Sequence, residues 1–214
     1  MEIAILLFDR LTTLDAVGPY EVLSRMPGAT VKMVAKQAGP QCNDVGSLAL
    51  VADYSLAEVP QLDILVIPGG PGQAALMDDE EVLSWVRHAH ETSKWTASVC
   101  TGSLVLGAAG LLKGLPATSH WLAYDALRAL GVEVTEQRVV IAGKIITAAG
   151  VSAGIDMALT LVAKECSETV AQVIQLMIEY DPQPPFDAGA PSKAPAAIVE
   201  RLRARSRFIM QGSR

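Results

Sequence analysis

The segment Lys94–Leu112, KWTASVCTGSLVLGAAGLL, constrains the fold of this chain more than any other. It predicts a short apolar strand over Trp95–Val99, followed at once by a helix of small residues over Gly102–Leu111. Cys100 lies at the junction. A strand that breaks directly into a helix forces its junction residue into a sharp, often strained turn, with the side chain standing out from the sheet edge. We therefore consider Cys100 as a candidate nucleophile.

A helix N-terminus suits a reactive thiol, because it offers unpaired N–H groups and partial positive charge. These groups favour the thiolate, so we expect a lowered pKa for Cys100. The backbone N–H of Thr101 is one donor at this position. By residue type alone, however, a cysteine after an apolar strand is more often a small core residue than a nucleophile.

The rest of the chain alternates short apolar strands with helices, which predicts a doubly wound α/β sandwich with a mostly parallel central sheet, of the flavodoxin-like kind. The expected strands are Ile3–Phe8, Thr30–Lys36, Gly46–Ala52, Asp63–Ile67, Val132–Thr135, Val139–Ala142 and Lys144–Thr147. Besides the helix after Cys100, we expect a helix from Pro19 to about Met26. Further helices are expected over Asp78–Glu91, Trp121–Leu130, Gly150–Lys164 and Ser167–Tyr180.

The chain of 214 residues is long enough for one large α/β domain and short for two. We see no internal repeat and no domain boundary before about residue 181. Residues 181–195 are rich in proline and predict an extended tail, followed by a final helix over 196–210. Arginines at positions 201, 203, 205 and 207 give this helix a solvated face.

Composition excludes several classes of protein. The net charge of −6 argues against nonspecific binding to nucleic acid or to an anionic membrane. Mean hydropathy is high at +0.32, but no run of 18 apolar residues predicts a transmembrane helix. The start, MEIAILLFD, lacks the basic region of a secretory signal, so we expect a cytoplasmic protein. The three widely spaced cysteines indicate neither a disulfide framework nor a zinc site.

Three predicted strand ends meet at one edge of the sheet. Asp15 follows the first strand, the turn Gly69-Gly70 follows Asp63–Ile67, and Cys100 follows the third. Attack by a cysteine on an electrophilic carbon needs a thiolate, donors for the developing negative charge and a group that moves protons. The Thr101 N–H and the glycine turn can supply donors, and Asp15 can carry the proton.

Each of these residues also has a simpler interpretation. Asp15 before Gly-Pro is common as a helix cap. The sequence PGGPG is weak evidence, because many strand–helix turns are glycine-rich, and it lacks both GxGxxG and a phosphate-loop lysine. His120 is either a second base or a structural histidine bonded at a strand end, and its residue type favours the structural role.

The motifs taken together resemble the PfpI-like, class I glutamine-amidotransferase-like superfamily. The matching pieces are FDRLTTLDAVGPYEVL, DILVIPGGPG, SVCTGSLVLGAAGLLKG, ATSHW and TAAGVSAGIDMALTLVA, in that order from residue 3 to about 190. This resemblance implies a nucleophile elbow at Cys100, a homodimer, and no metal or organic cofactor. It selects Asp15 as the acid–base residue over the nearby Glu21. No His-x-Glu pair follows the cysteine, so an amidotransferase triad is absent.

Within the superfamily the chain is most similar to isocyanide hydratases, through LDAVGP, GIDMALTL and the YDPQPPFDAGAP tail. The implied reaction is hydration of an isocyanide (R–NC) to an N-substituted formamide through a thioimidate on Cys100. Thr101 and Gly69-Gly70 would then position substrate or water, and Val151 and Ser152 would line a small, largely apolar pocket. His120 and Glu21 are accessory candidates.

Two other classes of function stay open on sequence alone. A cofactor-free glyoxalase or deglycase acting on 2-oxoaldehydes would also use Cys100, with His120 as base. A sensor domain of AraC-type regulators has similar motifs but precedes a helix-turn-helix module, for which about 20 residues after the tail are too few. Redox sensing through oxidation of Cys100 is compatible with any of these functions.

Overall fold

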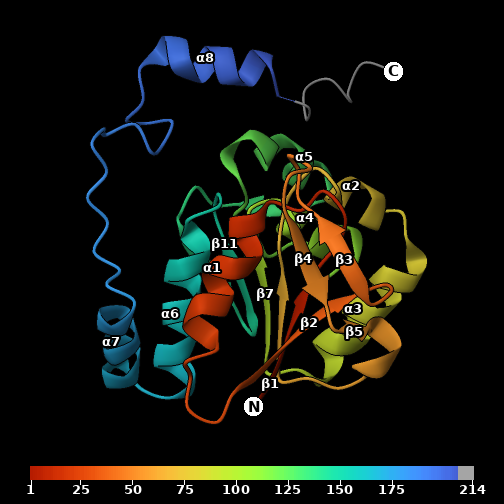
Figure 1. The fold of residues 1–214 in the computed structure, drawn as a ribbon. Coiled ribbons are helices and arrows are strands. Elements are labelled where there is room, and N and C mark those ends of the chain that lie inside the picture. The colour runs from red at the N-terminus through yellow and green to blue at the C-terminus, as the bar shows by residue number, and fades with distance from the viewer. Residues whose placement is uncertain (207–214) are drawn as a thin grey trace.

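The computed structural model describes residues 1–206 and places a seven-stranded sheet between two layers of helices (Figure 1). The strand order is β10-β11-β7-β6-β1-β2-β5, and every neighbouring pair is parallel except β10 with β11. The strands are β1 (Glu2–Leu6), β2 (Thr30–Ala35), β5 (Tyr54–Ser55), β6 (Ile64–Ile67), β7 (Trp95–Val99), β10 (Val139–Ala142) and β11 (Ile145–Ala148). The predicted α/β sandwich with a mostly parallel sheet is confirmed.

The three strands whose ends we expected to converge are neighbours at the centre of this sheet. β6 pairs with β1 on one side and β7 on the other. All four residues of β6 are buried, and so are the last four of β1 and of β7. Strands buried on both faces are mostly apolar, which explains the hydrophobic runs in the sequence, although β7 also buries Thr96 and Ser98.

Helices cover both faces of the sheet. On one face α1 (Thr13–Leu23) packs against α6 (Ala153–Glu165), as Figure 1 shows. On the other face α4 (Gly102–Ala108) contacts its neighbours α2 (Gln73–Leu76), α3 (Glu80–Thr92) and α5 (Tyr124–Ala129). Two single turns of 3-10 helix, η1 (Leu56–Glu58) and η2 (Trp121–Ala123), complete this layer.

Two small sheets lie outside the main one. The expected strand over Gly46–Ala52 forms β4 (Ala49–Ala52), paired antiparallel with β3 (Gly39–Cys42). The segment before His120 forms β8 (Pro116–Ala117), which pairs with β9 (Glu133–Val134). Gly143 makes the hairpin turn between β10 and β11 with φ +60°, a conformation that glycine adopts without strain.

The predicted start of the first helix is wrong. α1 begins at Thr13, so Asp15 lies inside its first turn and Pro19 lies in the helix interior. Pro19 lacks the N–H that would bond to the carbonyl of Asp15, four residues earlier. Only one backbone hydrogen bond is lost, and the packing of α1 on α6 offsets this loss. The two helices are close, since a β-carbon at Gly18 would lie 3.2 Å from Ile155. Tertiary packing thus overrides the Gly-Pro turn signal.

The chain after α6 forms what we call the C-terminal arm, residues 166–206. Ser167 caps α7 (Glu168–Met177) by accepting a hydrogen bond from the Val170 N–H. An extended tail then runs along the domain, and α8 (Ala196–Ala204) lies across the end where the parallel strands have their carboxyl ends (Figure 1). The expected continuation of α8 over 207–210 lies outside the described residues.

No helix within residues 1–206 is long and apolar enough to cross a membrane.

Candidate active site

Cys100 occupies a strained turn between β7 and α4. Its φ of +56° lies in the left-handed region, which a residue with a β-carbon adopts only when its surroundings enforce it. The Cys100 N–H bonds to the carbonyls of Ala148 and Ala149 at 3.1 and 3.0 Å. The Cys100 carbonyl accepts from the hydroxyls of Ser103 at 3.2 Å and Ser119 at 2.9 Å. These bonds hold the predicted elbow in place.

The Cys100 thiol lies in a pocket of backbone donors. The residue is only 5% exposed. The N–H groups of Thr101 and Val151 both point at the sulfur. Val151 is itself strained, with φ +36°, in the turn that precedes α6. Two strained turns, one after β7 and one after β11, therefore place two donors where a thiolate or a negatively charged intermediate would need them.

Asp15 lies beside this thiol and is completely buried. Its Oδ2 accepts a 2.9 Å hydrogen bond from the Gly69 N–H, and the carboxyl interacts directly with Cys100. Its Oδ1 has no hydrogen-bond partner among the described residues. A buried carboxylate oxygen without a partner is costly, so such groups are retained where chemistry uses them.

The environment raises the pKa values of both groups. Burial raises the pKa of Asp15 from 3.8 to about 7, against the opposing hydrogen bond from Gly69. Burial and the neighbouring Asp15 carboxylate raise the pKa of the Cys100 thiol above its usual range. Our expectation of a lowered thiol pKa is therefore wrong, because two backbone donors do not compensate for desolvation beside a carboxylate. The resting site is a neutral thiol facing a carboxyl group that titrates near pH 7.

The glycine turn after β6 holds the side chains of Asp15 and Thr101 in place through its two backbone N–H groups. The Gly69 N–H is committed to Asp15, and the Gly70 N–H donates to Thr101 Oγ1 at 3.0 Å. A β-carbon at Gly69 would lie 2.5 Å from the Thr101 nitrogen and 2.9 Å from Asp15 Oδ2. Glycine is thus required because backbone and carboxylate approach here, and the turn positions side chains instead of binding substrate directly.

A cavity of about 370 Å³ opens at Cys100. This volume suits a small organic molecule. The wall is partly apolar, as expected from the sequence, but also includes a histidine, an arginine and hydroxyl groups. The lining residues are Thr12, Cys100, Thr101, His120, Leu122, Val151, Leu202, Arg205 and Ser206.

The accessory candidates fall in different places. His120 lines the cavity, and its Nδ1 accepts from the Leu122 N–H at 3.3 Å, so it has the structural role of capping η2. Glu21 does not line the cavity; it is exposed on α1 and pairs with Arg25 at 2.7 Å. Ser152 lines a neighbouring cavity instead, where its hydroxyl accepts from Arg138 at 3.3 Å. The i,i+4 spacing of Glu21 and Arg25 was the signal for their surface pairing.

Within residues 1–206, no three His, Cys, Asp or Glu side chains lie close enough together to hold a metal ion. Of the three free cysteines, Cys42 and Cys166 are exposed and Cys100 is buried. The contact between the Cys100 thiol and the Asp15 carboxyl allows nucleophilic attack by Cys100 with proton transfer through Asp15.

Sequence reasoning missed several contributors. The hydroxyls of Ser103 and Ser119 hold the elbow, and the N–H of Val151 faces the sulfur. Leu202, Arg205 and Ser206 line the cavity from the far end of the chain. The only signal was indirect, since Ser119 adjoins His120 and Val151 follows a glycine turn. Contacts between distant segments leave no local pattern.

Comparison with known proteins identifies a family and several relatives of this chain. Residues 1–164 match the DJ-1/PfpI family. An isonitrile hydratase from Pseudomonas putida is 43% identical over 206 residues, which span 96% of this chain and 90% of that protein. A THiJ/PfpI family protein from Pseudomonas syringae has a crystal structure that aligns with a TM-score of 0.91 at 42% identity, over 95% of this chain and 84% of that chain.

A more distant relative is a deglycase from Thermococcus kodakarensis, 29% identical over 67% of this chain and 86% of that protein. The resemblance inferred from the motifs is confirmed. By fold, by the match over residues 1–164 and by its relatives, the chain belongs to the DJ-1/PfpI family.

Proposed function

We propose that this protein hydrates isonitriles, also called isocyanides, to N-substituted formamides. The observation that carries the proposal is the buried pair of Cys100 and Asp15, in which a neutral thiol faces a carboxyl that titrates near pH 7. Such a pair can take a proton from the thiol and return it to carbon within one catalytic cycle. The 43% identity to an isonitrile hydratase over nearly the whole chain supports the same reaction.

In the first half of the reaction Asp15 removes the thiol proton, and the Cys100 sulfur bonds to the terminal carbon of R–NC. The electron pair released onto that carbon takes the proton from Asp15, which leaves a thioimidate, R–N=CH–S–Cys100. The N–H groups of Thr101 and Val151 stabilise the thiolate before attack, at the position where they already face the sulfur.

In the second half water adds to the thioimidate carbon, with Asp15 as the base that accepts its proton. As the tetrahedral intermediate collapses, its hydroxyl proton passes to nitrogen, the C=O bond forms and the C–S bond breaks, which gives R–NH–CHO. Cys100 leaves as a thiolate and recovers its proton from Asp15. Thr101 lines the cavity, and its hydroxyl has a proton to donate while its oxygen accepts from Gly70, so it orients substrate or water.

A homodimer in the cytoplasm is the working form that we propose. Supporting the dimer, α7 presents exposed apolar side chains, with Val173 at 54%, Leu176 at 81% and Met177 at 64% exposure. Contiguous exposed apolar residues of this kind mark interaction surfaces. A reducing compartment would keep the catalytic thiol reduced.

The deciding experiment offers the purified protein a small alkyl isonitrile and, separately, methylglyoxal, and measures formamide and lactate. We expect formamide from the first and little lactate from the second. Robust lactate production without formamide would overturn the proposal in favour of the glyoxalase or deglycase reaction, for which the 29% identical deglycase is the only support among the relatives described above.

Variants separate the two reactions further. Asp15→Asn should abolish hydration, whereas His120→Ala should keep much of it, because His120 caps η2 and Asp15 faces the sulfur. A 2-oxoaldehyde reaction that used His120 as base would show the reverse order of losses.

A further inference from the structure

The outer wall of the Cys100 cavity comes from the C-terminal arm. Leu202, at the end of α8, and Arg205 and Ser206, just after it, line the cavity together with Cys100. The match to the DJ-1/PfpI family covers residues 1–164, so these three residues lie beyond the segment that defines the family. The catalytic pair and the outer wall therefore come from separate parts of the chain.

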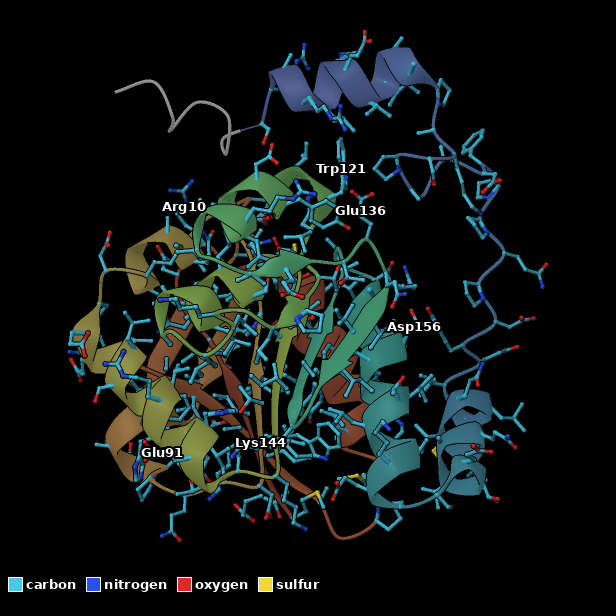
Figure 2. All side chains as sticks on the ribbon, turned by 180° about the vertical axis from the view of Figure 1, so that it is seen from behind. Arg10, Glu91, Trp121, Glu136, Lys144 and Asp156 are labelled. Atoms are coloured by element: carbon cyan, nitrogen blue, oxygen red, sulfur yellow. The ribbon has the colours of Figure 1, made fainter. Side chains whose placement is uncertain are left out.

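α8 is held over the cavity by few contacts. None of its residues is buried, but Ser206, just after it, is only 5% exposed. The Arg203 guanidinium lies 5.9 Å from the centre of the Trp121 ring, within the range of a cation–π contact. Figure 2 shows Trp121 and Glu136 on the part of the domain that lies beneath α8. The helix is thus anchored at its C-terminal end, next to the cavity.

The charge of this wall contrasts with the rest of the chain. The protein carries a net charge of −6, yet no carboxylate is among the cavity-lining residues within the described part of the chain. Arg205 contributes the one full positive charge among those lining residues, and it forms no ion pair with any residue in 1–206. An unpaired guanidinium on a cavity wall favours an anionic ligand.

We propose that Arg205 is a specificity-determining residue, and that it selects isonitriles whose R group carries a carboxylate. The proposal rests on the proposed hydration reaction and names its substrate class. The isonitrile carbon would bond to Cys100, the linking carbons would contact Leu122, Val151 and Leu202, and the carboxylate would meet Arg205 at the outer end. Guanidinium and carboxylate match in geometry through two parallel hydrogen bonds.

The test compares pairs of substrates that differ only in charge. We would measure kcat/KM for 3-isocyanopropanoate and 5-isocyanopentanoate, each against its methyl ester. The wild-type protein should prefer at least one carboxylate over its ester. Arg205→Gln should lower kcat/KM for that carboxylate by roughly tenfold to a hundredfold, mostly through KM, and leave the ester within about twofold. Arg205→Lys should restore part of the preference, because the charge returns without the planar fork.

Arg201→Gln is the matched control, since Arg201 lies on the same helix, is exposed, and does not line the cavity. It should leave the ratio of carboxylate to ester unchanged. Equal kcat/KM for carboxylates and esters in the wild type, or a preference that survives Arg205→Gln, would overturn the proposal about Arg205 while hydration itself stands. No formamide from any of the four substrates or from a simple alkyl isonitrile would instead overturn the proposed reaction.

Discussion

The two parts of the molecule that meet at the cavity are built on different physical principles. At the carboxyl edge of the sheet, Asp15 and Cys100 are buried, and hydrogen bonds from neighbouring backbone N–H groups and hydroxyls hold them in place. The C-terminal arm is mostly exposed, and α8 has no buried residue. Burial sets the protonation state and the geometry of Asp15 and Cys100, so this edge of the sheet determines the reaction. The arm contributes side chains without a core of its own, so it adjusts which substrate enters.

The largest effect should come from removing the nucleophile. Cys100→Ala should lower formamide production on the order of 10³-fold or more, because no other residue of 1–206 that lines the cavity carries a thiol. The fold should survive, since the hydrogen bonds that hold the turn come from the backbone of residue 100. Circular dichroism checks the fold and product assays check the rate. Formamide production close to the wild-type rate would contradict the covalent mechanism.

Asp15→Asn should lower kcat/KM by about 10²- to 10⁴-fold, because the isosteric amide cannot move the proton. The same change should speed alkylation of Cys100 by iodoacetamide at pH 8, since the carboxylate that raises the pKa of the thiol is gone. Glu21→Gln on the same helix is the control and should alter neither rate, because Glu21 is on the surface. Slower alkylation in Asp15→Asn would show that Asp15 activates the thiol more than it suppresses its ionisation.

The pH dependence should report the raised pKa of Asp15. Activity needs the carboxylate, so kcat/KM should fall about tenfold per pH unit below about pH 7. The free energy of unfolding should depend on pH in the opposite direction. A folded-state pKa raised from 3.8 to about 7 gives stability that is full below pH 3.8 and is lost as pH rises through 7, a total of about 4 kcal/mol.

Chemical denaturation of the wild type and of Asp15→Asn across pH 4 to 8 checks this stability change. The difference in unfolding free energy should move in favour of Asn as pH rises. Parallel curves for the two proteins would mean that Asp15 is not desolvated as the structure indicates.

The smallest effect should come from the arm. Leu202 is 47% exposed, so Leu202→Ala should leave the melting temperature nearly unchanged. It should raise KM for a bulky isonitrile by about two- to tenfold, with kcat within about twofold, because the lost contact lies on the cavity wall and away from the sulfur. A large loss of kcat would contradict the view that the sheet edge carries out the reaction while the C-terminal arm only selects the substrate. Steady-state kinetics on a small and a bulky isonitrile measures it.

Local patterns predicted the elements well and their exact limits less well. Trp95–Val99 was predicted at its observed bounds, because a short apolar run between polar residues has one interpretation in a parallel sheet. The start of α1 was missed because Gly18-Pro19 signals a turn locally, whereas packing of α1 on α6 keeps both residues helical. The lowered pKa expected for Cys100 was wrong for a similar reason, since burial is a property of the whole fold.

The sequence by itself determined the α/β architecture, the elbow at Cys100 and the convergence of three strand ends. These follow from hydrophobic periodicity and from the rule that parallel strands end at one edge. Only the tertiary structure decided the chemistry at that edge. It buried Asp15 against the thiol, turned the Val151 N–H toward the sulfur and brought Arg205 to the cavity from more than 100 residues along the chain. Desolvation and contacts between distant residues depend on packing in three dimensions, which no local pattern encodes.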